Sequence, residues 1–508
     1  MDSKGLTAVI RFPGADYTQR TVLAAARRVL PATSTIFVTD VEDGEATEQL
    51  CSEEGEHARR MLFFCDYDLL PFEGLLRHSE RLLCSSYVIR KALIRKQYLA
   101  HALHSYQLKQ SGDGTRPAKQ VTPRTWHIEI NFADELDELL LDDLYDLNAE
   151  LEENEGREPT NRKWFILKPA MADRGNGIRL FSSLERLQSI FEEFEEDDDE
   201  DDDEDDDDEE EAEVEGDQVN PNGGRDTAVI TSQLRHFVIQ DYISSPLLLC
   251  APSPSQPTLP RKFHLRAYVL GVGALKVYLA DEMLALFAPL PYSPPGAEGD
   301  DGNDSYPSDD LRRHLTNTCL QSEGPQDGSS KVSEENVFLF SELRGMPFLR
   351  SQDGTTSSTS PQTVDPASLP GLSETQLTQI KEAVVDVLAT TFTACATTGS
   401  IHWQMWPNAF EVFGIDLLVE SNAPSVSDSS NPAVQDEFKV SLLEINAQPD
   451  FAQSGSRLEP TIEHLFGRVM ELAVLPFFAK EAAPLHSTVG QSVEGMTLCL
   501  DLQLSKAW

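Results

Sequence analysis

The chain has 508 residues, 40% of them apolar, so we expect two or three subdomains rather than one core. Its formal net charge is −45, and it stays clearly acidic without the 22 carboxylates between Glu192 and Asp217. Because nucleic-acid surfaces need clustered Lys and Arg to displace counterions, we expect no direct nucleic-acid binding.

Cysteine usage and apolar run lengths bear on the compartment. The seven cysteines are scattered and form no CxxC pair, which argues against a disulfide framework or structural zinc site and for a reducing compartment. The apolar runs are too short to span a membrane. The first residues lack the pattern of a signal peptide. We therefore expect a cytoplasmic protein without a membrane partner.

The first 88 residues alternate between strand and helix patterns. Apolar, β-prone runs lie at Leu6–Arg11, Ser34–Thr39 and Met61–Cys65, and Tyr17–Leu30 has helical periodicity. This order predicts a small open α/β subdomain over residues 1–88.

A second unit is expected over residues 89–243. Ser86–Gln107 is predicted to be a basic amphipathic helix with a solvated face. A strand at Lys163–Lys168 leads through a glycine-bearing loop to a helix at Ser183–Phe194. Residues 192–226 are predicted to be a disordered insertion, because a self-repelling acidic tract poor in apolar residues cannot fold alone.

A third unit is expected over residues 244–480, before a tail at 481–508. Segments rich in Ser, Gly, Pro and Asp predict flexible insertions at 293–310, 322–335 and 351–373. The ordered elements expected from Phe237 onwards are strands at Phe237–Tyr242, Arg261–Leu270, Leu275–Leu279, Phe410–Glu420 and Phe438–Asn446, and helices at Glu374–Thr397 and Leu458–Phe478.

A strand-ending lysine followed by a glycine loop suggests phosphate binding. Lys168 is followed by Arg174, Gly175 and Gly177. A lysine ammonium can sit on nucleotide phosphates, glycines let backbone N–H groups approach those oxygens, and an arginine can add a contact. For this pattern alone, an ordinary structural turn is the alternative.

Two predicted strands carry groups suited to a nucleotide. Lys262, His264 and Arg266 alternate along one strand and share a face, which suits a polyphosphate; the solvent face of an edge strand is the alternative. The strand at Phe237–Ile243 can pair its edge with an adenine ring, or be a core strand only.

Acidic and amide side chains recur at the ends of two later strands. Glu444 and Asn446 are two residues apart and point to one side of a strand, and Asp416 can reach them from the neighbouring strand. Three hard oxygen ligands facing one spot suit Mg²⁺, which completes its shell with water and phosphate oxygens. A solvated strand face is the alternative.

In this order and spacing, the constellations resemble the tubulin-tyrosine-ligase-like family. The matching stretches are WFILKPAMADRGNGI, FVIQDYISSPLLL, RKFHLRAYVL, HLTNTCLQ, FEVFGIDLLVE and LLEINAQPDFAQ. The resemblance runs from about Tyr87 to Phe478 and is to a fungal member in SYVIRKALIRK and MLALFA. It implies an α/β (α+β) ATP-grasp fold, in which the nucleotide lies between two lobes.

The resemblance also implies a role for each matching residue. Lys262, Arg266 and Glu444 become the candidate catalytic residues. The ATP contacts implied are Lys96, Lys168, Arg174, Gly175, Gly177, Gln240, Asp241, Tyr242, Ile243, Lys262, Asn317 and Asp416, and the implied Mg²⁺ ligands are Asp416, Glu444 and Asn446.

The activity implied is an ATP-dependent carboxylate–amine ligase with ATP and Mg²⁺ as cofactors. A protein carboxylate, with tubulin suspected, would attack the γ-phosphorus, and the amine of a free amino acid, tyrosine or glutamate, would attack the acyl phosphate. The alternative is a weak or inactive ATP-binding module that acts by protein contacts, for example in cytoplasmic mRNA-processing bodies (P-bodies). We expect a cytoplasmic location, with microtubule or P-body association.

Two residues depart from the family's pattern. His264 stands where the family usually has Asp, and Asp281 stands where it usually has Arg. A carboxylate at an anion-handling site would repel a carboxylate or phosphate, so the resemblance predicts an altered or weak amino-acid site unless another basic residue substitutes. The acidic tract is interpreted either as a mimic of an acidic tubulin tail or as a solvated insertion.

Overall fold

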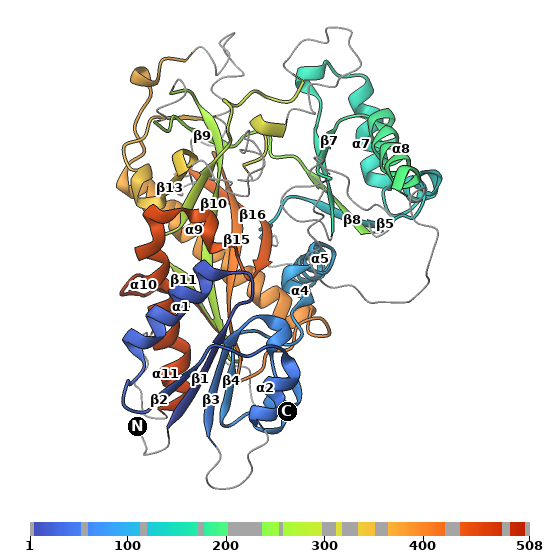
Figure 1. Cartoon of the computed structure of the whole chain (residues 1–508). Helices are drawn as coiled ribbons and strands as arrows, with labels where there is room; N and C mark the ends of the chain where they lie inside the picture. Colours follow the sequence, from blue (N-terminus) through green and yellow to red (C-terminus); the bar gives the residue numbers. More distant parts are fainter. Residues whose placement is uncertain are drawn as a thin grey trace.

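The computed structural model describes residues 5–51, 59–111, 119–170, 177–201, 236–252, 258–296, 311–316, 334–350, 364–421, 437–479 and 488–502. Their strands form three sheets (Figure 1). An N-terminal sheet lies at the base and a large sheet runs through the middle. The third sheet, in the lobe at the upper right, is called the central sheet here because its strands lie between those of the other two along the chain. None of the described helices is long and apolar enough to cross a membrane.

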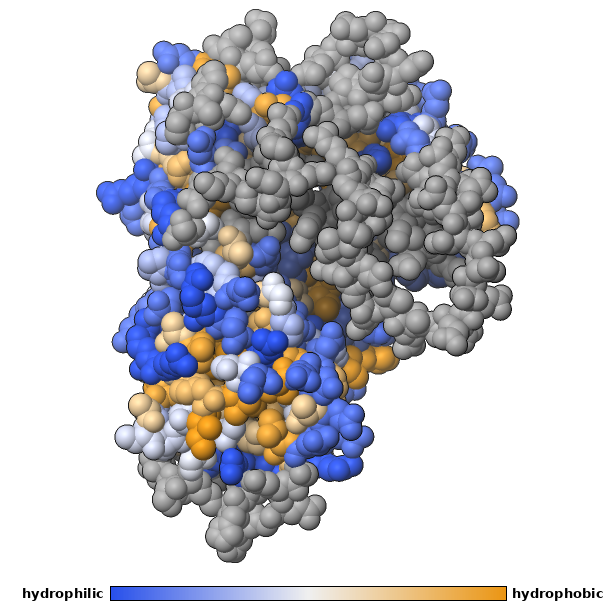
Figure 2. Space-filling view, in the orientation of Figure 1, coloured by the Kyte–Doolittle hydropathy of each residue, from blue (hydrophilic) through white to orange (hydrophobic). Residues whose placement is uncertain are grey.

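The N-terminal sheet is parallel, in the order β2-β1-β3-β4. Its strands are β1 (Leu6–Arg11), β2 (Thr35–Val38), β3 (Arg60–Cys65) and β4 (Leu82–Cys84), connected through α1 (Asp16–Val29), α2 (Gly44–Cys51) and α3 (Phe72–Arg77). The three predicted strands and the helix are confirmed. On the face seen in Figure 2, apolar side chains gather over this lower part of the molecule.

The central sheet is antiparallel, in the order β5-β8-β6-β7. Its strands are β5 (Thr125–Glu129), β6 (Phe165–Pro169), β7 (Arg179–Phe181) and β8 (His236–Asp241), and the helices beside it are α6 (Leu136–Leu141), α7 (Tyr145–Glu155) and α8 (Leu184–Asp201). Phe165, Phe181 and Phe237 pack against Phe191 of α8 in one apolar cluster. The helices therefore cover one face, and the other face is left for the cavity described below.

The large sheet is built around three long antiparallel strands, β10 (Arg261–Val272), β15 (Phe410–Ser421) and β16 (Phe438–Ala447). Its other strands are β9 (Leu247–Leu249), β11 (Lys276–Ala280), β12 (Leu284–Phe287), β13 (Val337–Leu339), β14 (Phe348–Arg350), β17 (Ser492–Val493) and β18 (Met496–Asp501). In register, Arg266 lies opposite Asp416, and Asp416 lies opposite Glu444.

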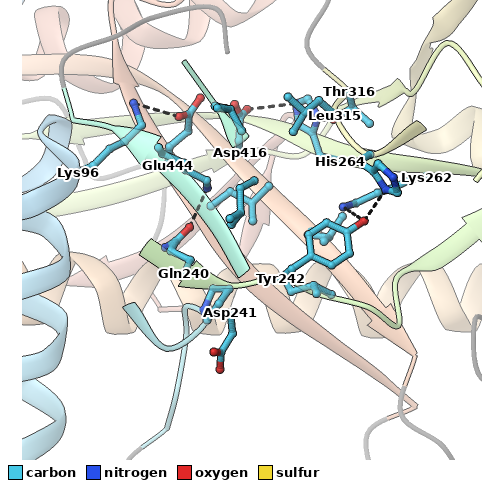
Figure 3. A pocket seen from close by; sticks show the side chains of 18 of the residues that line it. Lys96, Gln240, Asp241, Tyr242, Lys262, His264, Leu315, Thr316, Asp416 and Glu444 are labelled. Carbon is cyan, nitrogen blue, oxygen red and sulfur yellow. Dashed lines mark hydrogen bonds and ion pairs between the residues drawn. The ribbon is translucent and has the colours of Figure 1, made fainter. Parts of the chain in front are cut away.

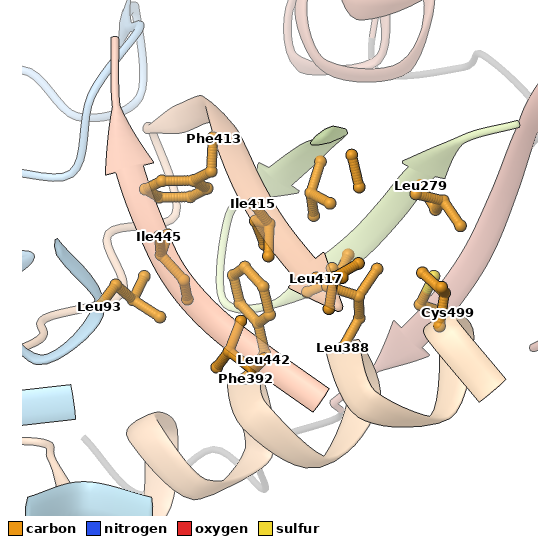
Figure 4. Packing of buried hydrophobic residues seen from close by; sticks show 14 of the residues in the cluster. Leu93, Leu279, Leu388, Phe392, Phe413, Ile415, Leu417, Leu442, Ile445 and Cys499 are labelled. Atoms are coloured by element: carbon orange, nitrogen blue, oxygen red, sulfur yellow. The ribbon is translucent and has the colours of Figure 1, made fainter. Parts of the chain in front are cut away.

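Helices cover both faces of the large sheet. The long helix α9 (Glu374–Thr398) begins with a Ser373–Gln376 capping box and buries Leu388 and Phe392 against one face. Figure 4 shows these two side chains beside Phe413, Ile415, Leu417, Leu442 and Ile445 of β15 and β16. The lower part of the opposite face packs on α1 and on α10 (Glu459–Val469), which a π-helical turn joins to α11 (Leu475–Phe478).

Two sequence predictions about elements are wrong in detail, and the structure places part of a tail that the sequence left unplaced. The helix expected at Ser86–Gln107 is two helices, α4 (Lys91–Ile94) and α5 (Lys96–Ser111), because Arg95 is extended and Tyr87 is held in the core through Glu411 and Gly273. Helix α8 continues to Asp201 rather than ending at Phe194. Part of the predicted tail joins the large sheet, where β18 pairs with β11. The boundaries at 88, 243 and 480 remain predictions.

Candidate active site

Most of the predicted site residues line one cavity between the central and large sheets (Figure 3). Lys168 and Gln240 come from β6 and β8, and Lys262 and Glu444 come from β10 and β16. The predicted residues that line the cavity are Lys96, Lys168, Gln240, Asp241, Tyr242, Ile243, Lys262, Asp416, Glu444 and Asn446.

A β-bulge in β16 puts Glu444 on the cavity side of the sheet. Asp416 pairs with Glu444, but the next residue, Leu417, pairs with Leu442, so Leu443 is the extra residue. Leu442 and Ile445 both belong to the core cluster that includes α9. Without the bulge, residues 442 and 444 would share one face, because side chains alternate along a strand.

Asp416 is held by two basic side chains of β10. Arg266 donates to both of its carboxylate oxygens at 2.5 and 3.0 Å, and Nε2 of His264 lies 3.4 Å from Oδ1. Burial alone raises the pKa of the Asp416 carboxyl, but Arg266 and His264 outweigh it and hold the pKa below its ordinary value. Nδ1 of His264 bonds Thr316, so His264 bridges two walls of the cavity.

Three lysines face the acidic residues. Burial lowers the pKa of Lys262 to about 7, with a further lowering from Lys168. Burial also lowers the pKa of Lys168 to about 8, against the attraction of Glu444. Lys96, the first residue of α5, lies 3.6 Å from Glu444 and is only 18% exposed, so it is not on the solvated face expected of a lone basic helix. The cavity therefore combines buried basic side chains with carboxylates, an arrangement that suits an anionic ligand.

The opposite end of the cavity is apolar and aromatic. Nζ of Lys262 lies 4.4 Å from the centre of the Tyr242 ring and donates to its hydroxyl at 3.2 Å. The same hydroxyl bonds Nδ1 of His314 at 3.0 Å. Ile166, Ile178, Leu315 and Leu418 also line this cavity. Flat apolar walls beside a strand end suit a purine ring, as predicted for the residues after Phe237.

Two carboxylates point elsewhere than predicted. Asp241 is paired with Arg124 at 3.1 Å and Lys163 at 3.3 Å, and Figure 3 shows its carboxylate turned away from the other labelled side chains. Asp281 lies 3.0 Å from Lys381 of α9 and accepts from Ser492 and Thr497. Asp281 does not line this cavity, and its predicted effect on the amino-acid site stays a prediction.

Some predicted site residues are not in the cavity wall. Arg174, Gly175 and Asn317 lie outside the described residues, as does most of the acidic tract. Gly177 is described, with a φ of 68° that glycine adopts without steric cost. Arg266 touches the site through Asp416 rather than lining the cavity.

The uncharged residues that shape the cavity could not be predicted from the sequence. Ile166, Leu418 and Leu443 are apolar residues in apolar strands, and their sequences give no local signal that they face a cavity. Thr316 directly precedes Asn317, the predicted ATP contact in the HLTN stretch. Because neighbouring residues of an extended segment point to opposite sides, the prediction for Asn317 gave no reason to expect Thr316 in the site.

The oxygen donors at the base of the cavity fit a magnesium ion. Carboxylate and amide oxygens are hard ligands, and Mg²⁺ is commonly held by one or two carboxylates plus substrate phosphates. Asp416 is 5% exposed, and basic neighbours now balance its charge, as Lys96 balances that of Glu444. The described residues contain no group of three His, Cys, Asp or Glu side chains placed to hold a metal.

Comparison with known proteins identifies the family. Residues 83–347 and 367–482 match the family described as the tubulin-tyrosine ligase family. The chain belongs to this family. The tubulin-tyrosine ligase match covers every residue of the cavity described above.

Two fungal relatives are named as probable tubulin–tyrosine ligases. The chain is 34% identical over 442 residues to "Probable tubulin--tyrosine ligase C12B10.04" of Schizosaccharomyces pombe, covering 87% of this chain and 88% of that protein. It is 32% identical over 423 residues to "Probable tubulin--tyrosine ligase PBY1" of Saccharomyces cerevisiae, covering 83% of this chain but only 47% of that protein.

A solved structure shows the fold. The crystal structure of the C-terminal domain of K. lactis Pby1, described as "an ATP-grasp enzyme interacting with the mRNA decapping enzyme Dcp2", matches with a TM-score of 0.57 and 24% identity. The match covers 98% of this chain and all of that one. This member of the tubulin-tyrosine ligase family therefore has an ATP-grasp fold, as the sequence predicted.

Proposed function

We propose that the chain is an ATP-dependent ligase that joins an amino acid to a protein carboxylate. The observation that carries this is that one cavity is lined both by the buried Lys168 and Lys262 and by Asp416 and Glu444. Buried lysines and hard oxygen ligands together suit a polyphosphate with its magnesium ion.

Each wall of the cavity has a part in this chemistry. The apolar end with Tyr242 would hold the base, and Lys168 and Lys262 would hold the phosphates. Asp416, Glu444 and Asn446 would hold Mg²⁺, which supplies charge neutralisation on the transferring phosphoryl group. Arg266 orients Asp416 by two hydrogen bonds. Residues act here by positioning and electrostatics, so the site needs no side-chain nucleophile.

The proposed reaction has two steps and involves no change of oxidation state. The acceptor carboxylate displaces ADP from the γ-phosphorus and becomes an acyl phosphate. The amine of the donor then displaces phosphate, loses a proton and forms the amide. Tyrosine or glutamate is the proposed donor and tubulin the proposed acceptor, because both curated relatives are named probable tubulin–tyrosine ligases.

A second candidate function is an ATP-binding module that works by protein contact in P-bodies. It is favoured by the solved structure, whose protein is described as interacting with the decapping enzyme Dcp2. The net charge of −45 also opposes approach to an acidic tubulin tail. Cytoplasmic association with P-bodies or microtubules belongs to the same proposal.

The test is amino-acid-dependent ADP release with Mg·ATP, a panel of amino acids and tubulin. Glu444→Gln should lower this rate about 100-fold, because loss of a metal carboxylate removes several kcal/mol of charge stabilisation. Glu382→Gln, a matched change at an exposed position of α9, should leave it unchanged. Full activity in Glu444→Gln would contradict the assigned site, and nucleotide binding without any turnover in the natural protein would favour the second candidate.

A further inference from the structure

A second cavity, of about 450 Å³, lies outside the nucleotide site and shares no residue with it. Its walls are the segment after β1, the end of β3, the start of α1, part of β15 and the turn after β16. We call it the switch-point cavity. Its volume is within the range of about 300–1,000 Å³ that small-molecule sites occupy.

Its position follows from the topology of the N-terminal sheet. β1 is flanked by β2 on one side and by β3 on the other, and all three strands run parallel. Connections from neighbouring strands therefore diverge between β1 and β3, and they leave a crevice beyond the carboxyl ends of these strands. Phe12 and Gly14 follow β1, and Asp66 follows β3, so the cavity occupies this crevice.

Aromatic rings form one side of the switch-point cavity. Phe12 contacts Phe64 edge to face at 5.8 Å between ring centres, and Phe64 contacts Phe466 at 5.9 Å. Phe451 lies 4.9 Å from Phe466 and continues the row. Tyr17 also lines the cavity. Rings in this number offer apolar contact and the faces to which cations are attracted.

Every charged residue that lines the cavity is acidic: Asp16, Asp66, Glu411 and Asp450. Glu411 is only 2% exposed and forms an ion pair with Arg90, whose Nε lies 3.2 Å from its Oε1, while burial raises the pKa of its carboxyl to about 7. Arg20 lies over the Tyr17 ring but is paired with Glu459 at 3.0 Å. With Glu411 paired to Arg90, the other three aspartates still give the lining an excess of negative charge, which would repel a phosphate or carboxylate.

We propose that the switch-point cavity binds an organic cation, an ammonium or guanidinium group on an apolar stem of the kind that arginine and lysine carry. The aromatic row packs on the stem and on the planar cation, and the carboxylates at the rim balance its charge. A bare metal ion is a poor occupant, because the carboxylates among the described residues are not grouped closely enough to hold one. The site goes beyond the ligase proposal and needs neither ATP nor turnover.

The test uses the full chain without nucleotide, titrated calorimetrically with agmatine, which carries a guanidinium and an ammonium at the two ends of a four-carbon stem. We expect saturable binding, and binding of N-butylurea, a neutral compound with a four-carbon stem, at least about ten-fold weaker, because the charge-assisted contacts are lost. Absence of saturable agmatine binding, or equal binding of the urea, would overturn the proposal. Because this comparison uses the natural protein, it does not depend on any variant's folding.

Two substitutions then locate the site. Asp450→Asn and Asp66→Asn remove charge but keep an acceptor for the backbone N–H that each aspartate caps, from Ala452 and Asp68. Each should weaken agmatine binding about five-fold, the scale of a partly exposed ion pair. Asp365→Asn is the matched control, since Asp365 caps Ala367 at the same 3.0 Å distance and does not line the cavity. Equal affinity in all three variants would place the ligand elsewhere.

A comparison of probes separates the two sources of such a cation. Nα-acetyl-arginine amide presents only the side chain, as a protein partner would, and free arginine adds its charged α-groups. Binding of the amide as tight as that of agmatine assigns the cavity to a basic side chain of a protein. Binding of free arginine alone assigns it to a small molecule. Failure of all cations would remove this site and leave the nucleotide assignment unaffected.

Discussion

Lys262 is the residue whose chemistry depends most on its surroundings. It is 7% exposed, it donates to Tyr242, and its pKa is lowered to about 7. The unfolded chain keeps this proton up to about pH 10, so between these values the unfolded state binds more protons than the folded state. The lysine therefore makes the nucleotide-free protein more stable as pH rises through this window.

Burial favours the neutral form of Lys262 in the nucleotide-free protein. Nucleotide binding should favour the protonated form instead, because phosphates attract the charged lysine. We expect ADP affinity to fall as pH rises above about 7, by up to about ten-fold per pH unit for one coupled proton. Calorimetry in buffers of different ionisation enthalpy measures the proton uptake. Lys262→Arg should reduce the uptake, because arginine stays charged throughout. Lys276→Arg, at the half-exposed pair with Asp501, should not. Equal uptake in both variants would contradict the assignment of Lys262 to the phosphates.

At the scale of the element, the turn after β16 joins the two cavities. Asn446 lines the nucleotide cavity, and Gln448 and Pro449 line the switch-point cavity. Gln448 has a φ of 47°, which is uncommon for a residue with a side chain. Pro449 packs directly on Gly414 of β15, where an added Cβ would lie 2.8 Å from the proline Cβ. Glycine is therefore required on the neighbouring strand for the turn to lie where it does.

Gly414→Ala should displace this turn. We expect a loss of about 1–3 kcal/mol in the free energy of unfolding, the scale of overpacking in a rigid core, together with weaker nucleotide binding. Denaturant unfolding and ADP titration measure the two effects. Gly156→Ala is the control, since its added Cβ would lie 3.7 Å from the backbone oxygen of Glu153 and its φ is −83°. An unchanged free energy of unfolding in Gly414→Ala would show that the turn can shift away from the added methyl group without destabilising the protein.

At the scale of the whole molecule, charge is the unusual property. The chain has 86 acidic and 41 basic side chains. Local networks offset part of this, such as Arg124 and Lys163 with Glu150 and Asp241. The remaining excess should oppose compaction by self-repulsion.

Added salt should therefore stabilise the protein. Raising KCl from about 0.05 to 0.5 M shortens the screening length, and we expect the melting temperature to rise by on the order of 3 °C, the shift that about 1 kcal/mol produces in a large domain. Differential scanning calorimetry measures the shift, with buffer ionic strength as the only variable. A fall in melting temperature would mean that the attractive networks outweigh the general repulsion.

The sequence alone determined the features that depend on neighbouring residues. Strand alternation placed Lys262 and His264 on the cavity side of β10, and the apolar runs located the long strands to within a few residues. The motifs in their order carried the resemblance to the tubulin-tyrosine ligase family, which implied the ATP-grasp fold that the solved structure supports. These predictions succeeded because they rest on local periodicity and on motifs that stay contiguous in the chain.

Only the tertiary structure decided what depends on distant pairing. The bulge at Leu443 that turns Glu444 toward Asp416, the break at Arg95 that starts α5 at Lys96, and the pairing of Asp281 with Lys381 each arise between segments far apart in sequence. The switch-point cavity likewise exists only where β1, β3 and the turn after β16 meet. A local pattern can say that a side chain is charged or apolar, but its partner is chosen by the packing of the whole chain.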